Sequence, residues 1–327
     1  MKRALRVVAV LVGLLALACA GFVTATWAPD RSVDELKARW APPPSTFLEV
    51  NGLSVHLRDE GPRDDALPVV LLHGTSASLH TWDGWTAALR RDHRVIRFDL
   101  PGFGLTGPAP DGDYSIAAYV RVVGAVLDKL NVKRCVLAGN SLGGEIAWAT
   151  AVAQPERLAG LVLVDAAGYP LESESVPIGF RLAKLPVVNR LLLKTLPRGV
   201  VASSVRNVYG DPSRVTDALI DRYYELTLRA GNRAALPLRF SHAAHGAHAA
   251  DIARVKTPTL ILWGGKDRLI PPSHAERFLK DITGSAQVRF DGLGHVPHEE
   301  DAQATVVPVQ KFLYILAGPA PRPAPTP

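Results

Sequence analysis

Short runs rich in apolar residues alternate with amphipathic segments along most of this chain. Each run has the length of a buried strand and is followed by glycine or polar residues; the runs are 69–72, 95–98, 135–138, 161–164, 259–263 and 286–290. Between them, Ile116–Leu130 carries apolar residues at helical spacings of three and four. Apolar strands alternating with helices predict an α/β fold with a doubly wound, mostly parallel sheet covered on both faces. Asn51-Gly52 separates two further strand-like segments, which predicts a hairpin before this sheet.

The alternation stops after residue 167 and resumes near residue 253. Residues 168–252 are mostly helical in pattern and are interrupted by prolines. We therefore predict a helical cap inserted between two parts of one core, residues 47–167 and 253–317. A closing helix is expected over 303–316, followed by a Pro/Ala-rich tail at 318–327 that we predict to be disordered.

The first 28 residues have the pattern of a membrane segment. Lys2, Arg3 and Arg6 precede a run of uncharged, mainly apolar residues that extends to Trp27. This length is enough to cross a bilayer, and the basic end predicts a cytoplasmic N-terminus. Cleavage near Ala18-Cys19-Ala20 and lipidation of Cys19 are the alternatives, and all three place the catalytic domain on the non-cytoplasmic side. We favour an uncleaved anchor, with residues 29–46 as the linker to the core.

Composition narrows the function classes. The chain has 327 residues, of which 47% are hydrophobic and 21% charged, so it can build a large core. Its net charge of +6 is partly confined to the N-terminus and to a stretch around 181–206 that has no acidic residue. The remainder is nearly balanced, which argues against a nucleic-acid partner. Two cysteines, Cys19 and Cys135, do not make a disulfide framework.

The most informative motif is Gly139-Asn140-Ser141-Leu142-Gly143, a G-x-S-x-G sequence between a predicted strand and a predicted helix. Glycines permit the tight turn that exposes the Ser141 hydroxyl at the strand's end. The first N–H groups of the helix lack intrahelical partners and favour negative charge. Ser141 is therefore a candidate nucleophile, and the Leu142 N–H a candidate oxyanion donor.

Other polar residues also follow predicted strands. These are His73, Asp99, Asp165, Asp267 and His295, and the carboxyl ends of parallel strands are where such sheets bind ligands. A histidine can take the proton of a serine and return it to the leaving group, and a carboxylate can orient that histidine.

In these pieces the chain resembles the α/β-hydrolase fold family over about residues 47–315. The resemblance rests on five segments in the family's order: 73–74, 99–104, 139–144, 263–267 and 294–297. It implies that Ser141 is the nucleophile, Asp267 the acid and His295 the base. It also implies that the backbone N–H of Thr75 joins that of Leu142 in the oxyanion hole.

Several assignments have competitors. Asp165 is the alternative acid, because some branches of the family carry it there, but Asp267 matches the local pattern better. His298 is expected at the surface, His73 under the oxyanion loop, and Asp99 in its own Pro-Gly turn. His242, His245 and His248 recur every third residue without a carboxylate or cysteine cluster, so we expect a polar segment. No cofactor motif is present, and neither a cofactor nor a metal is predicted.

The resemblance leaves the substrate open, and the oligomeric state is not predicted. We expect a serine hydrolase acting through an acyl-enzyme on carboxylic esters of apolar or lipid-like small molecules. The alternatives are a carbon–carbon bond hydrolase of the meta-cleavage-product type and a catalytically silent binding protein. The oxyanion segment Thr75-Ser76-Ala77-Ser78 is less glycine-rich than is usual in the carbon–carbon hydrolases. The apolar and basic stretch Ile178–Val201 is expected to pack in the cap or to face anionic lipid.

Overall fold

A computed structural model describes residues 2–243 and 246–318. The strands are β1 (Thr46–Val50), β2 (Leu53–Glu60), β3 (Val69–Leu72), β4 (Val95–Phe98), β5 (Cys135–Asn140), β6 (Leu158–Val164), β7 (Thr259–Gly264) and β8 (Ala286–Phe290). The α-helices are α1 (Lys2–Ala25), α2 (Val33–Trp40), α3 (Asp83–Leu89), α4 (Ile116–Lys129), α5 (Leu142–Ala153), α6 (Ile178–Ala183), α7 (Pro186–Leu192), α8 (Arg198–Val208), α9 (Asp217–Thr227), α10 (Asn232–Ser241), α11 (Ser273–Asp281), α12 (Pro297–Glu300) and α13 (Ala302–Ala317). The predicted disorder of the tail concerns residues 319–327, which lie outside the described residues.

All eight strands form one sheet, in the order β1-β2-β4-β3-β5-β6-β7-β8. The hairpin β1–β2 is antiparallel and adds to β4 in antiparallel fashion, while the six strands from β4 to β8 are parallel to one another. The predicted fold class is therefore confirmed, including the hairpin around Asn51-Gly52. In this order β5 is central, so the turn after it opens at the middle of the sheet's carboxyl edge.

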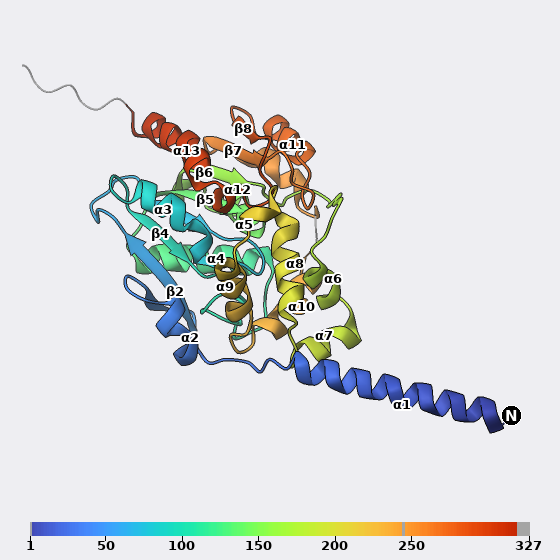
Figure 1. Ribbon diagram of the computed structural model, residues 1–327. Helices are drawn as coiled ribbons and strands as arrows, with labels where there is room; N and C mark the ends of the chain where they lie inside the picture. The colour runs from blue at the N-terminus through green and yellow to red at the C-terminus, as the bar shows by residue number, and fades with distance from the viewer. Residues whose placement is uncertain (1, 244–245, 319–327) are drawn as a thin grey trace, which may run out of the picture.

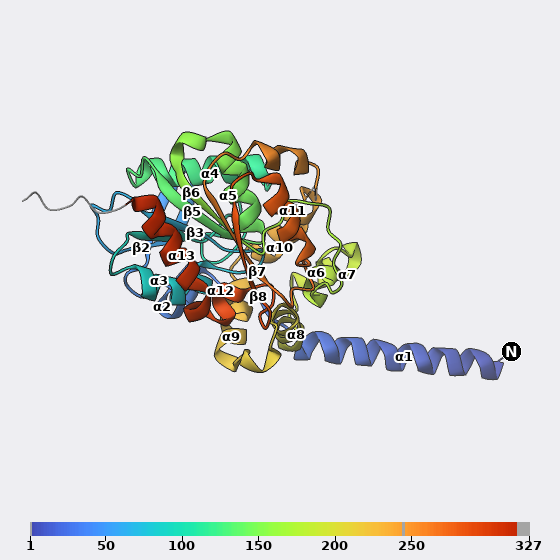
Figure 2. The ribbon, with the colours of Figure 1, turned by 90° about the horizontal axis from the view of Figure 1, so that it is seen from above.

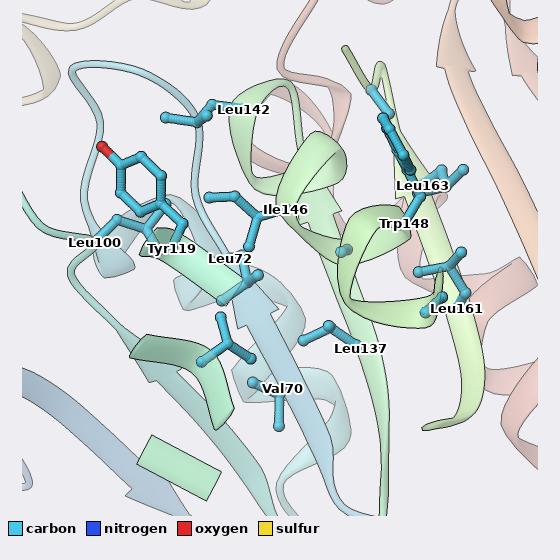
Figure 3. Packing of buried hydrophobic residues seen from close by; sticks show 14 of the residues in the cluster. Val70, Leu72, Leu100, Tyr119, Leu137, Leu142, Ile146, Trp148, Leu161 and Leu163 are labelled. Atoms are coloured by element: carbon cyan, nitrogen blue, oxygen red, sulfur yellow. The ribbon is translucent and has the colours of Figure 1, made fainter. Parts of the chain in front are cut away.

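Alternate residues of the buried strands pack on opposite sides of the sheet. On one face, Val70, Leu72, Leu137 and Leu161 contact helices α4 and α5, as Figure 3 shows. On the other face, their neighbours in the sequence pack against η1 (Leu79–Trp82), α3 and α13. Both faces are covered by helices, which explains why the inner strands read as continuous apolar runs and show no alternation.

Helices α6 to α10 lie between β6 and β7 in the sequence, where the inserted cap was predicted. They gather on one side of the sheet, over the ends of the parallel strands (Figure 1). We refer to Ile178–Ser241 as the cap. The exact limits of the domains stay a prediction.

Helix α1 projects from the body on the side of the cap, and both views show it without neighbours along most of its length (Figures 1 and 2). It is long and apolar enough to cross a membrane, with a mean hydropathy of 2.6 over its best window and no part of that window buried. The segment after α1 pairs with the cap through a bridge between Trp27 and Thr195. Helix α2 then starts with a capping box formed by Ser32 and Glu35.

Candidate active site

Ser141 sits at a strained turn between β5 and α5. Its backbone φ of 54° and ψ of −115° lie outside the regions that L-residues usually adopt. The turn is possible because glycines occupy the positions where its backbone passes very close to neighbouring chain. A Cβ atom on Gly143 would lie 2.2 Å from the carbonyl oxygen of Leu72. This backbone conformation places the Ser141 side chain above the edge of the sheet, where it lines a pocket.

Two backbone N–H groups beside Ser141 have no acceptor within the described residues. One belongs to Leu142, the first residue of α5, and the other to Thr75 in the loop after β3. Both Ser141 and Thr75 line the same pocket. His73 supports this loop from below, because its Nε2 accepts from the N–H of Leu100 at 2.9 Å and its Nδ1 donates to the carbonyl oxygen of Gly74 at 2.7 Å. Burial lowers the pKa of His73, so its ring is neutral in the role of a structural prop.

His295 and Asp267 form a buried hydrogen-bonded pair. The Nδ1 of His295 donates to Oδ2 of Asp267 at 2.7 Å, and the other carboxylate oxygen accepts from the N–H groups of Leu269 and Ile270. His295 also lines the pocket that contains Ser141. Its Nε2 forms no hydrogen bond in the part of the chain that the structure describes. This nitrogen is therefore the one available to a serine proton or a substrate.

Asp165 follows β6 and is fully buried beside this pair. Its Oδ1 accepts from the N–H of Gly264 at 2.9 Å, whereas Oδ2 has no donor among the described residues. Burial, together with the neighbouring Asp267 carboxylate, raises the pKa of Asp165 well above its usual range. Because His295 bonds Asp267, the geometry favours Asp267 over Asp165 as the group that orients the histidine.

The loop that carries His295 is held by groups that the sequence did not reveal. Glu300 accepts hydrogen bonds from the N–H groups of Gly294, Gly210 and Asp211 at 2.8–2.9 Å. The N–H of His295 donates to the carbonyl oxygen of Val208, at the end of α8. The histidine loop is thus bonded directly to the cap. Glu300 escaped prediction because its two partners in the cap are about 90 residues away and no local pattern marks them.

Asn140 links the serine turn to the same loop. Its Nδ2 donates to the carbonyl oxygens of Val164 at 3.1 Å and of His295 at 2.9 Å. The residue that precedes Ser141 therefore sets the position of the histidine backbone relative to the turn. The G-x-S-x-G motif contained this asparagine but gave no reason to assign it a role.

The pocket above Ser141 has a volume of about 160 Å³ and is walled mainly by the cap. Its apolar lining includes Phe180, Leu192, Leu196 and Leu236. Arg233 is the one cationic residue of the lining as described, and its guanidinium is already paired with Asp30 and the carbonyl oxygen of Leu192. The pocket, as far as the structure describes it, therefore offers apolar surface and no free positive charge.

The surface position expected for His298 is wrong. Its ring is fully buried and stacks on Trp82 with centroids 3.9 Å apart, and neither ring nitrogen has a partner among the described residues. Pro297 opens α12, which folds back against α3 and η1 and carries His298 inward. Burial and the neighbouring His295 lower its pKa well below the usual value, so the ring is a neutral packing group.

Two other expectations concerned Asp99 and the three regularly spaced histidines. Asp99 does hold its own turn, since it accepts from the N–H of Leu105, and it also binds the N–H of Leu79 and the ring of His56. Of the three regularly spaced histidines, His245 lies outside the described residues, so the expected polar segment is described only in part. His242, which caps the C-terminus of α10, bonds the carbonyl oxygen of Leu238 in that helix.

One group of described side chains brings metal-ligand atoms together. These atoms belong to Asp165, Asp267 and His295 and lie within 4.8 Å of one another. A metal ion there would have to break the His295–Asp267 hydrogen bond and compete with two backbone N–H groups. The arrangement suits a hydrogen-bonded acid–base pair better than a metal site.

Comparison with known proteins supports this architecture. The family model described as alpha/beta hydrolase fold matches residues 68–302. A 2-hydroxy-6-oxononadienedioate/2-hydroxy-6-oxononatrienedioate hydrolase of Pseudomonas is 29% identical over 280 residues, which cover 81% of this chain and 93% of that protein.

Two solved structures extend the likeness. A meta-cleavage product hydrolase from Pseudomonas fluorescens superposes with a TM-score of 0.71 at 25% identity, covering 82% of this chain and 97% of the other. A structure described as a membrane phospholipase A superposes with a TM-score of 0.70 at 24% identity, covering 98% of this chain and 100% of the other. That second likeness concerns the fold and includes the N-terminal region. The chain belongs to the α/β-hydrolase fold family.

Proposed function

We propose that the protein is a serine hydrolase that cleaves carboxylic esters of apolar, lipid-like molecules by way of an acyl-enzyme. The observation that carries this proposal is the shared pocket of Ser141 and His295, with His295 bonded to Asp267 at 2.7 Å and the remaining walls mostly apolar. Membership of a hydrolase family supports the general reaction class.

In the proposed reaction, the Ser141 Oγ attacks the ester carbonyl carbon while Nε2 of His295 takes the hydroxyl proton. The negative charge that forms on the carbonyl oxygen is stabilised by the N–H groups of Leu142 and Thr75. One such donor is worth about 3 kcal/mol in the transition state. Asp267 stabilises the imidazolium that forms. His295 then passes the proton to the alcohol, which leaves.

The second half of the reaction repeats these roles with water. His295 takes a proton from a water molecule as the water oxygen attacks the acyl carbon. The tetrahedral intermediate collapses, the acid is released, and the proton returns to Ser141. Asn140 and Glu300 act on this sequence only through the position of the histidine loop.

We propose further that α1 anchors the protein in a membrane, with the catalytic domain on the non-cytoplasmic side. Three features of α1 support this role: its apolar length, its basic first residues, and the absence of buried side chains among those that the structure describes in this helix. Removal of the segment after export is the alternative.

Carbon–carbon bond cleavage is the second candidate function, because relatives named as hydrolases of dioate ring-fission products are 29% identical to this chain. A dioate carries two carboxylates and calls for cationic partners in the pocket. Arg233 is the one described cation of the lining, and Asp30 already neutralises it. This difference favours an uncharged ester substrate.

The test uses the full chain in detergent micelles, a fluorophosphonate probe, and a panel of esters of graded acyl length beside a ring-fission diketone. We expect Ser141→Ala to abolish labelling and ester hydrolysis. Ser204→Ala is the matched control, because Ser204 lines the same pocket but bonds the cap backbone. Labelling that survives Ser141→Ala would refute the nucleophile. An unlabelled wild-type protein would favour a silent binding protein, and turnover of the diketone alone would favour carbon–carbon cleavage.

A further inference from the structure

The segment around α7 exposes large apolar side chains on the side of the cap from which α1 departs: Leu185 precedes this helix, Leu191 lies in it and Leu193 follows it. Leu185, Leu191 and Leu193 are 49%, 53% and 37% exposed. They fall within nine residues of one another in the sequence, and Figure 1 shows α7 near the C-terminal end of α1, where that helix meets the body. Clustered exposed leucines of this kind mark surfaces that bind a protein or a membrane.

Basic side chains surround these leucines. Arg181, Lys184, Arg190 and Lys194 are all exposed, and none forms an ion pair with any residue in the described ranges. No aspartate or glutamate occurs between residues 175 and 210. Lys184 lies over the ring of Phe240, 5.0 Å from its centroid, but no acidic residue of the cap neutralises the positive charge on this face. That charge therefore remains available to an anionic surface.

The face is attached to the end of α1 by backbone hydrogen bonds. The N–H of Ala28 donates to the carbonyl oxygen of Lys194, and the N–H of Leu196 donates to that of Thr26, both at 3.0 Å. Arg233 adds an ion pair with Asp30. The exposed leucines thus begin where the apolar helix ends, so a bilayer that surrounds α1 also reaches α7.

The same short segment forms a wall of the pocket. Phe180 on α6, Leu192 on α7 and Leu196 after it line the pocket that contains Ser141. Arg181, Leu191 and Leu193, which adjoin Phe180 and Leu192 in the sequence, are exposed. The segment of α6 and α7 therefore lies between the pocket of Ser141 and the exposed leucines.

We propose that this face docks on a phospholipid bilayer with anionic headgroups, and that apolar substrate enters the pocket from the bilayer beside α6 and α7. The docking face consists of Leu185, Leu191 and Leu193 with Arg181, Lys184, Arg190 and Lys194. The leucines enter the acyl region, and the basic groups bind lipid phosphates. Docking rests on the proposed anchor, and the entry route rests also on the proposed ester hydrolysis.

The first experiment measures docking without using activity. The full chain carries Leu191→Cys in a Cys19→Ser background and an environment-sensitive fluorophore, and it is placed in single-copy nanodiscs of phosphatidylcholine and phosphatidylglycerol. Burial raises the pKa of the remaining Cys135 to about 12, so that thiol stays unlabelled. Leu279→Cys on α11 is the matched control, because Leu279 is 42% exposed.

We expect nitroxide groups on the lipid acyl chains to quench the label at position 191 and to leave the label at position 279 bright. Equal quenching at both positions would overturn the proposal. Quenching of position 191 by a second labelled copy in larger vesicles, but not by lipid in single-copy discs, would also overturn it and would assign the face to self-association.

The second experiment tests the charges and the entry route. A triple variant, Lys184→Gln, Arg190→Gln and Lys194→Gln, is compared with a control that removes the same charge from exposed positions elsewhere: Lys129→Gln, Lys133→Gln and Lys311→Gln. The rate on a lipid-embedded ester, divided by the rate on a soluble short ester, falls on the order of tenfold in the first triple and stays unchanged in the second. An equal ratio in both triples overturns the entry route. A wild-type protein inactive on every ester overturns the proposed function instead, and the quenching result still decides docking.

Discussion

Replacing Asp165 by asparagine should stabilise the fold increasingly as the pH rises. Asp165 is fully buried, receives one backbone N–H on Oδ1 and has no donor for Oδ2 among the described residues. Desolvation and the nearby Asp267 carboxylate raise its pKa well above 3.8. The folded protein therefore keeps a proton on Asp165 that the unfolded chain releases. An asparagine side chain at this position is the permanently neutral equivalent, with an amide group that can donate to Asp267.

The magnitude follows from proton linkage. Above the ordinary aspartate pKa and below the raised one, the folded wild type binds one proton more than the unfolded chain. Its free energy of unfolding then loses about 1.4 kcal/mol per pH unit through this group. The asparagine variant loses nothing there. The stability difference between variant and wild type should be flat in acid, grow at that slope as the pH rises, and level off once the folded carboxyl ionises.

The assay is urea unfolding of the full chain in micelles, followed by tryptophan fluorescence at a series of pH values. Asp64→Asn, which removes an exposed carboxyl group, is the matched control. A stability difference for Asp165→Asn that does not change with pH would refute the reasoning, because Asp165 would then be ionised in the folded protein. Hydrolysis provides a second check. We expect Asp165→Asn to retain activity and Asp267→Asn to lose about 10⁴-fold, and the reverse pattern would make Asp165 the orienting acid.

Two further predictions address the backbone around the site. Glu300→Gln replaces one of the oxygens that accept from Gly294, Gly210 and Asp211 with an amide donor. We therefore expect the free energy of unfolding to fall by about 2 kcal/mol and kcat/KM to fall about tenfold, both measured against the exposed Glu156→Gln. Unchanged kinetics would show that the hydrogen bonds of Glu300 do not position His295. Gly143→Ala places a Cβ atom 2.2 Å from the carbonyl oxygen of Leu72 and should lower the free energy of unfolding by about 3 kcal/mol or more. Gly199→Ala is the control, because the space around Gly199 is open, and it should be neutral or stabilising. Equal effects of the two substitutions on unfolding would contradict the steric argument.

The sequence predicted the sheet well because the parallel strands β3 to β7 are buried on both faces. Each of these strands appears as a run rich in apolar residues, and Ile116–Leu130 and 303–316 were recovered as helices within about two residues at each end. The cap was expected only as a helical region. Its helices are short, several begin at prolines, and their ends depend on contacts with distant parts of the chain.

The candidate site was predictable where local pattern and chemistry coincide. Ser141 lies in a motif that needs its glycines, and His295 follows a recognisable loop. His298 was placed wrongly because nothing in Pro297-His298-Glu299 shows that α12 turns back onto Trp82. The choice between Asp165 and Asp267 needed coordinates, since both follow strands and only the hydrogen bond to His295 distinguishes them.

The hydrogen bond from His295 to Val208 joins the roof of the pocket to the proposed base. A change in the cap helices therefore also changes the position of the His295 imidazole. A chimaera that takes helices from a relative to alter substrate preference should keep residues 208–211 together with Glu300, so that the incoming roof meets the same acceptors. Chimaeras that cut inside this stretch should bind new ligands and turn them over slowly, because the segment that shapes the pocket also fixes the position of the proposed base.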